Sequence, residues 1–179
     1  MDGAPVSFII QVLASLTLFG QILIIVLLGL LIVSIFKKKP SSSSVFKFLS
    51  QNSLYFAFFV SSIAVAGSLF LSEIALFTPC KLCWFQRIFM YPQVVILGIG
   101  AFKDDFNIKK YSIVLSIFGF LIASYHYLLQ LYPNILQCND EVASCSAKQF
   151  ASFGYITIPM MSATAFLLII LFLFLARRK

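Results

Sequence analysis

The sequence predicts an all-α protein that crosses a membrane several times. The chain has 179 residues, of which 61% are hydrophobic and only 11% are charged, and its mean hydropathy is +1.01. A soluble domain cannot bury this much apolar surface. The charged residues are also confined to short segments, which leaves long runs free of Asp, Glu, Lys and Arg. Together these observations predict a polytopic membrane protein built of helices.

We expect five transmembrane helices, because five runs are long enough to cross about 30 Å of hydrocarbon at about 1.5 Å per residue. The first run exceeds that length and requires tilt or overhang. No basic segment precedes it and its charges follow it, so we expect a retained anchor with its N-terminus outside, not a cleaved signal. The expected helices are about 8–36, 54–77, 84–102, 111–132 and 158–176.

The basic residues predict the orientation of these helices. Thirteen Lys and Arg against six Asp and Glu give a net charge of +7. All but three of the basic residues follow the first, third or last helix. Cytoplasmic segments of membrane proteins carry such an excess. The charge therefore reflects topology and not nucleic-acid binding, and all four cysteines fall on the extracytoplasmic side, where disulfides persist. The expected cytoplasmic residues are Lys37, Lys38, Lys39, Lys47, Lys103, Lys109, Lys110, Arg177, Arg178 and Lys179.

Two polar segments organise the chain. Residues 37–44 combine three lysines, a proline and four serines, a composition typical of a flexible linker. We therefore expect an N-terminal unit, residues 1–47, and a second unit, residues 48–179. Residues 133–157 form the one long external loop, in which aromatic residues recur among small polar ones. This loop either lies in the plane of the headgroups or is tucked against the helix ends.

The four cysteines form two natural pairs by spacing, Cys80 with Cys83 and Cys138 with Cys145. A C-x-x-C ring is too small to stabilise a fold much by loop entropy, whereas it suits thiol–disulfide exchange. Cys83 is expected in the first turn of a helix, where the helix dipole and a nearby cation favour the thiolate. Arg87 is that cation, one turn further along the same face. A dithiol at this position can reach both a protein in water and a carrier in lipid, such as a quinone.

Other interpretations of these residues remain open on the sequence alone. A four-cysteine zinc site is disfavoured, because an oxidising compartment disfavours free thiolates, and we expect no metal. The main alternative is a non-enzymatic scaffold or transporter subunit with two structural disulfides. Transporters, however, bury polar sites near the membrane midplane or carry inverted repeats, and this sequence shows neither feature. Arg87 could also simply snorkel to the interface.

Three ionisable side chains on three expected helices converge on one layer beneath Cys83. Glu73 and His126 lie roughly 6 and 9 Å below the outer boundary, from the number of residues to the helix ends, and Arg87 has a similar depth. Intramembrane ionisable groups usually have a partner or a function. We expect Glu73 to pair with Arg87 or Lys81. His126 either passes protons to a carrier or is a neutral histidine bonded to a neighbouring helix.

The motif Pro79-Cys-Lys-Leu-Cys-Trp-Phe-Gln-Arg87, continuing to Pro92, resembles the DsbB/BdbC family of disulfide bond formation proteins. Further matches are Gly67-Ser68-Leu69, Ser72-Glu73, Ser124-Tyr-His-Tyr127 and Ile156-Thr-Ile-Pro159, so the resemblance covers roughly 52–176. It implies a four-helix bundle in the bacterial cytoplasmic membrane. It also implies that the protein oxidises a thioredoxin-like partner of the DsbA/BdbD type and passes electrons to menaquinone or ubiquinone. Vitamin K epoxide reductase-like proteins share the chemistry, but their loop cysteines precede the C-x-x-C.

The resemblance also implies roles for individual residues. Arg87 matches the quinone-site arginine, with His126 and Glu73 as further cofactor-site candidates. Cys138 would form the mixed disulfide with the partner, and Cys145 would then attack Cys80. Cys83 would leave as the thiolate next to the quinone.

One departure from the family is the additional N-terminal transmembrane helix, residues 1–47. Residues 52–176 contain both cysteine pairs and every intramembrane ionisable group. The sequence therefore assigns the first helix only packing or partner contact.

Overall fold

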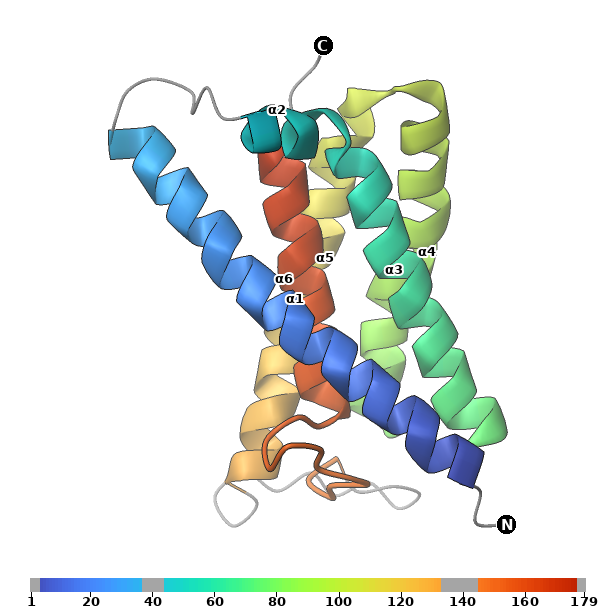
Figure 1. Ribbon diagram of the computed structural model, residues 1–179. Coiled ribbons are helices and arrows are strands. Elements are labelled where there is room, and N and C mark those ends of the chain that lie inside the picture. The colour runs from blue at the N-terminus through green and yellow to red at the C-terminus, as the bar shows by residue number, and fades with distance from the viewer. Residues whose placement is uncertain (1–3, 37–43, 133–144, 177–179) are drawn as a thin grey trace.

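The computed structural model describes residues 4–36, 44–132 and 145–176, and these are helical apart from short connections (Figure 1). Five of the described helical segments are long and apolar enough to cross a membrane, which confirms the predicted fold class. In order, the elements are α1 (Ala4–Phe36), α2 (Ser44–Gln51), α3 (Ser53–Leu69), the π-helical turn η1 (Phe70–Ile74), α4 (Lys81–Lys103), the 3-10 turn η2 (Phe106–Ile108), α5 (Lys109–Leu131) and α6 (Ile158–Leu175).

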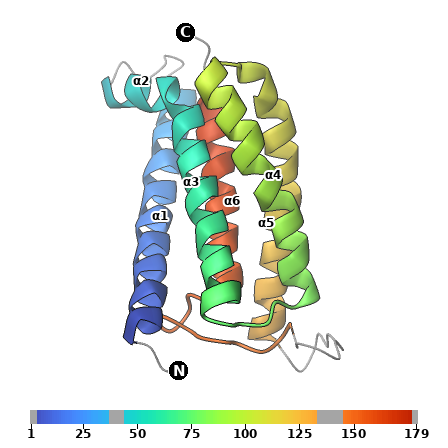
Figure 2. The same ribbon diagram turned by 90° about the vertical axis from the view of Figure 1, so that its right-hand side faces the viewer.

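Helices α3, α4, α5 and α6 form a bundle, and α1 lies outside it. Helix α6 packs against α1, α3 and α5 and is the most buried of the five spans. Helix α1 crosses the bundle obliquely in Figure 1 and lies at its periphery, beside α3 and α6, in Figure 2. The arrangement is therefore a four-helix bundle with one additional helix on its surface.

The two ends of the bundle differ in chemistry. Helix α2, the α4–α5 connection and the C-terminus of α6 lie at one end (Figure 1), which we call the lysine end because Lys47, Lys103 and Lys110 belong to it. The start of α1, the start of α4 and residues 145–157 lie at the opposite end. We call it the cysteine end, after Cys80 and Cys145. This separation is the one that the distribution of basic residues predicts.

Polar contacts between helices lie inside the bundle. Gln93 on α4 is fully buried, and its side-chain oxygen accepts hydrogen bonds from Ser112 at 2.7 Å and Ser116 at 2.9 Å, both on α5. Helices in lipid associate through such bonds and through close packing of small residues. Gly119 on α5 is one example, since a Cβ there would overlap the ring of Phe166.

The last residue of the predicted linker, Ser44, begins a helix, and residues 37–43 lie outside the described residues. Residues from Ser44 onward form the amphipathic helix α2, and Ser50 donates a hydrogen bond of 2.8 Å to the carbonyl of Leu175 on α6. The expected boundary after residue 47 thus falls inside a helix that is anchored to the bundle.

Candidate functional site

Cys80 and Cys83 lie at the start of α4. The helix begins at Lys81, three residues earlier than expected, with Cys80 as the N-cap residue and Cys83 in the first turn. The Cys80 thiol donates to Cys83 Sγ across 3.3 Å. This hydrogen bond and the burial of Cys80 raise its pKa to about 11, so Cys80 keeps its proton at neutral pH and Cys83 is the acceptor. The two sulfurs are close enough to form a disulfide bond with each other when the pair is oxidised.

His126 of α5 joins the C-x-x-C pair to the external loop. Its Nδ1 lies 3.0 Å from Gln86 Nε2, its Nε2 lies 3.1 Å from the carbonyl oxygen of Cys145, and Nε2 is also 3.7 Å from Cys80 Sγ. A carbonyl can only accept, so Nε2 must carry a proton, and Nδ1 then accepts from the Gln86 amide. This set fits a neutral imidazole that holds Cys145 beside Cys80.

Cys145 packs directly against the C-x-x-C pair. Cys80, Leu129 and Cys145 form one buried cluster, with Cys83 packed against it. This places a loop cysteine where thiol exchange with Cys80 requires it. Cys138, its expected partner in the second pair, lies outside the described residues.

Residues 145–157 are tucked against the helix ends, the second of the two arrangements that the sequence allows. Gln130 donates to the Ala147 carbonyl at 3.3 Å, and Gln149 donates to the Thr78 carbonyl at 3.1 Å. Ile156 is fully buried. The segment therefore covers the thiol cluster at the cysteine end.

Arg87 lies one turn after Cys83 and binds α3. Its Nε donates to Ser68 Oγ at 3.0 Å and its Nη2 to the Ser68 carbonyl at 3.1 Å. Tyr91 donates to the same hydroxyl at 3.4 Å, and the guanidinium carbon lies 5.2 Å from the centre of the Trp84 ring. The guanidinium carries further N–H donors beyond the two that Ser68 receives.

Of the two partners expected for Glu73, Arg87 or Lys81, Arg87 does not pair with it. Glu73 is exposed and its carboxylate accepts a 3.0 Å hydrogen bond from Ser72, while Arg87 is bound to Ser68. Glu73 lies in the π-helical turn η1, where Ala75 N–H donates to the Phe70 carbonyl. Neither of the two pockets described below has Glu73 among its lining residues.

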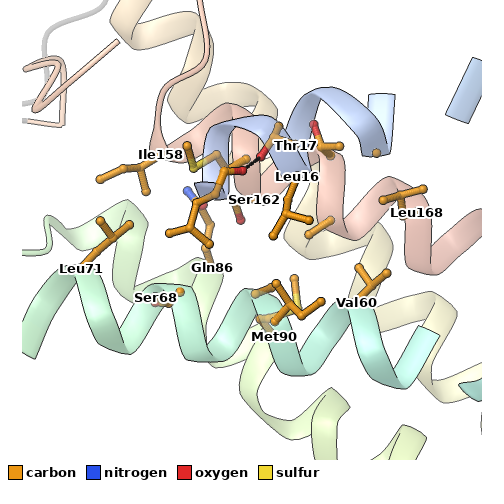
Figure 3. Close-up of a pocket in the computed structure, with 18 of the residues that line it drawn as sticks. Leu16, Thr17, Val60, Ser68, Leu71, Gln86, Met90, Ile158, Ser162 and Leu168 are labelled. Atoms are coloured by element: carbon orange, nitrogen blue, oxygen red, sulfur yellow. Dashed lines mark hydrogen bonds between the residues drawn. The ribbon is translucent and has the colours of Figure 1, made fainter. Parts of the chain in front are cut away.

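A cavity of about 530 Å³ lies between α1, α3, α4 and α6. In Figure 3 the labelled side chains of these four helices, with Leu71 of η1, surround one space. Its polar and charged lining is concentrated toward the cysteine end, and its lining toward the lysine end is apolar. Polar groups at the cysteine end come from Ser68, Ser72, Cys83, Gln86, Arg87, Tyr91 and Gln149.

A second, more polar pocket of about 210 Å³ lies on the other side of Cys83. Cys80, Cys83 and His126 line it. So do two buried side chains, Gln130 and Thr157, whose Oε1 and Oγ1 have no hydrogen-bond partner among the described residues. Cys83 lines both spaces, as do Gln149 and Ile158, so Cys83 lies between the thiol cluster and the apolar cavity.

One group of side chains has the composition of a metal site. The ligand atoms of Cys80, Cys83 and His126 lie within 4.8 Å of one another. Both nitrogens of His126 already have protein partners, Gln86 and the Cys145 carbonyl. A metal would have to displace one of them, and the observed contacts are those of hydrogen-bonded thiols.

Sequence reasoning missed several site residues. Gln86 is part of the Pro79–Arg87 motif, but its position in the sequence did not predict that it binds His126. Ser68 gave a weak signal, because it belongs to a Gly-Ser pair of the kind that marks close helix contacts. The contribution of α1 to the cavity had no sequence signal.

Residues 50–176 match the family model described as disulfide bond formation protein DsbB. Disulfide bond formation protein C of Bacillus subtilis (strain 168) is 46% identical over 127 residues, which cover 69% of this chain and 91% of that protein. A probable disulfide formation protein of Coxiella burnetii (strain CbuK_Q154) is 39% identical over 135 residues, 74% of this chain and 92% of that protein. No solved structure matches significantly.

Proposed function

Because this chain belongs to the DsbB family of disulfide bond formation proteins and is therefore a membrane thiol oxidase, we propose that it reoxidises a thioredoxin-like oxidase of the DsbA/BdbD type and delivers the electrons to a membrane quinone. The position of Cys83 carries this proposal, since it is the one described cysteine that lines both the thiol pocket and the apolar cavity. In the cell, the cysteine end faces the outside of the bacterial cytoplasmic membrane and the lysine end faces the cytoplasm.

The large cavity fits the shape and chemistry of a lipid quinone. Along α3, its lining runs from Ser68 at the polar end to Phe56, about 18 Å along the helix axis. Arg87 and Tyr91 line the polar end and can hydrogen-bond a ring carbonyl, and the apolar remainder suits an isoprenoid tail. A bound quinone would supply a two-electron acceptor that also takes up protons.

Before electrons reach the quinone, they pass through a relay of this chain's own thiols. A thiolate of the reduced partner attacks the Cys138–Cys145 disulfide, bonds to Cys138 and releases Cys145. Cys145 attacks Cys80 of the Cys80–Cys83 disulfide, and Cys83 leaves as the thiolate beside Arg87. The partner's second thiol then attacks the mixed disulfide, which releases the oxidised partner and the Cys138 thiolate. Cys138 attacks Cys145 in the Cys145–Cys80 disulfide, so the Cys138–Cys145 disulfide re-forms and Cys80 is released as a thiol. Each exchange breaks one disulfide and forms one, so two electrons reach Cys80 and Cys83.

His126 acts as a positioning residue in this relay, because it lies on the thiol side and does not line the large cavity. We expect His126→Phe to slow oxidation of the reduced partner about tenfold, the cost of roughly one buried hydrogen bond. Reoxidation of the pre-reduced Cys80–Cys83 pair by quinone should stay within about twofold of wild type. Rapid-mixing measurements of the two half-reactions separate these effects.

Tyr127→Phe is the matched control for His126→Phe, because it removes a different bond from α5 to the loop, the one to the Tyr155 carbonyl at 3.3 Å. It should leave both half-reactions unchanged. A His126 variant that is slow only with quinone would instead assign proton transfer to the carrier, the other role that the sequence allows.

The proposed function is tested by mixing the purified protein with a reduced thioredoxin-like dithiol protein and menaquinone-4. The wild-type chain should consume one quinone for each dithiol oxidised. Arg87→Lys keeps the charge but loses the planar fork that can bridge Ser68 and a carbonyl oxygen. We expect it to raise the KM for quinone about tenfold, with little change in expression.

The alternative, a scaffold or transporter subunit with structural disulfides, would give neither quinone reduction nor thiol oxidation by the wild-type chain. An unchanged KM in Arg87→Lys would leave this arginine only an interfacial anchoring role.

A further inference from the structure

Helix α1 lies outside residues 50–176, the segment that matches the family, yet it lines the large cavity over about ten residues of its length. The side chains of α1 that line this cavity are Leu13, Leu16, Thr17, Phe19 and Leu23, together with the backbone of Gly20. The sequence assigned this helix no part in the site. The structure makes it one of the four walls.

Close contacts fix α1 over the groove between α3 and α6. A Cβ on Gly67 of α3 would meet the Leu13 side chain at 3.1 Å, and a Cβ on Gly20 would meet Leu168 of α6 at 3.0 Å. Gln21 accepts a 2.7 Å hydrogen bond from Tyr155 of the external loop. Such close approaches and interhelical bonds are how helices associate in lipid, so α1 is a packed part of the protein.

The cavity opens toward lipid between α1 and α3. Four residues both line the cavity and expose much of their surface: Leu16 and Phe19 of α1, and Phe59 and Ile63 of α3. Phe59 lies about 13 Å along α3 from Ser68, on the side of the lysine end. Ile63 lies about 8 Å from Ser68 on the same side, so the opening begins beyond the polar end and extends toward the lysine end.

We propose that α1 is a wall of the quinone cavity and that α1 and α3 together form the opening through which the isoprenoid tail passes into the membrane. This inference rests on the proposed function. It assigns the ring to the polar end near Ser68 and Arg87, and the tail to the apolar space that α1 covers.

Substitution of Thr17 tests whether α1 bounds the site. Thr17 faces the cavity and Ser15 is exposed, and each hydroxyl donates to the carbonyl four residues earlier at 2.8 Å.

In lipid nanodiscs, menaquinone-4 should quench the fluorescence of Trp84, the single tryptophan of the chain, which lies beside Arg87. We expect Thr17→Phe to raise the Kd for menaquinone-4 at least about tenfold, because the ring fills the cavity, and the control Ser15→Phe to change it less than about twofold.

A second pair of variants, Phe19→Ala and Phe8→Ala, removes side-chain volume and so avoids inserting a large ring among packed side chains. Phe19 and Phe8 are 65% and 66% exposed, but only Phe19 lines the cavity. Phe19→Ala should weaken menaquinone-4 binding about fivefold and leave the binding of menadione, which lacks the tail, unchanged. Phe8→Ala should alter neither. The amount of quinone extracted from each purified variant gives an independent measure.

The outcomes distinguish this inference from the proposed function. If the wild-type chain binds menaquinone-4 and both Thr17→Phe and Phe19→Ala bind it equally well, α1 is not a wall of the site although the proposed function stands. If the wild-type chain shows neither quenching nor quinone reduction, the proposed function fails and this inference fails with it.

Discussion

Replacing Cys83 with serine is expected to abolish quinone reduction, lowering turnover by at least about a thousandfold, while capture of the partner at the loop cysteines continues. Cys83 is the described cysteine that lines both the thiol pocket and the apolar cavity, and a serine hydroxyl can neither form a disulfide nor release electrons. The change in quinone absorbance measures turnover, and non-reducing gels measure the mixed disulfide with the partner.

Ser162→Ala provides the control for Cys83→Ser, because Ser162 also lines the cavity (Figure 3) and takes no part in the proposed relay. It should retain most of the wild-type turnover. Normal turnover in Cys83→Ser would show that electrons leave the protein from a different sulfur, and the assigned order of thiols would then be wrong.

Replacing Cys145 with serine is expected to block the relay at its first transfer and to accumulate a covalent complex. Cys145 is buried and packed against Cys80, so its removal takes away the thiol that links the loop to the C-x-x-C pair. The Cys138 thiolate can still attack the disulfide of an oxidised partner and form a mixed disulfide, which no neighbouring thiol of this chain can displace. Non-reducing gels should show the complex, and steady-state turnover should fall below detection.

Cys138→Ser is the matched control for this trap. It leaves the buried Cys145 in place, and we expect little complex with the partner because Cys145 is covered by the loop. A complex that forms only in Cys138→Ser would reverse the roles of the two loop cysteines.

The sequence by itself determined the helices, their depth and the motif. Apolar runs mark where helices cross a membrane because the bilayer has a fixed thickness, and five such runs give the five observed spans. Counting residues from a helix end also placed Arg87 and His126 near the level of Cys83. The C-x-x-C spacing is local as well, and Cys83 lies in the first turn of a helix as expected, although that helix begins three residues earlier.

The tertiary structure decided which side chains face one another. Membrane helices are apolar on every face, so the sequence pattern does not fix their rotation about their own axes. Glu73 accepts a hydrogen bond from its neighbour Ser72, and the packing of α4 on α3 gives Arg87 the partner Ser68. His126 faces the thiols on one side of Cys83, and α1 closes the cavity on the other. These contacts join residues that are distant in the chain, and only the packing of whole helices brings them together.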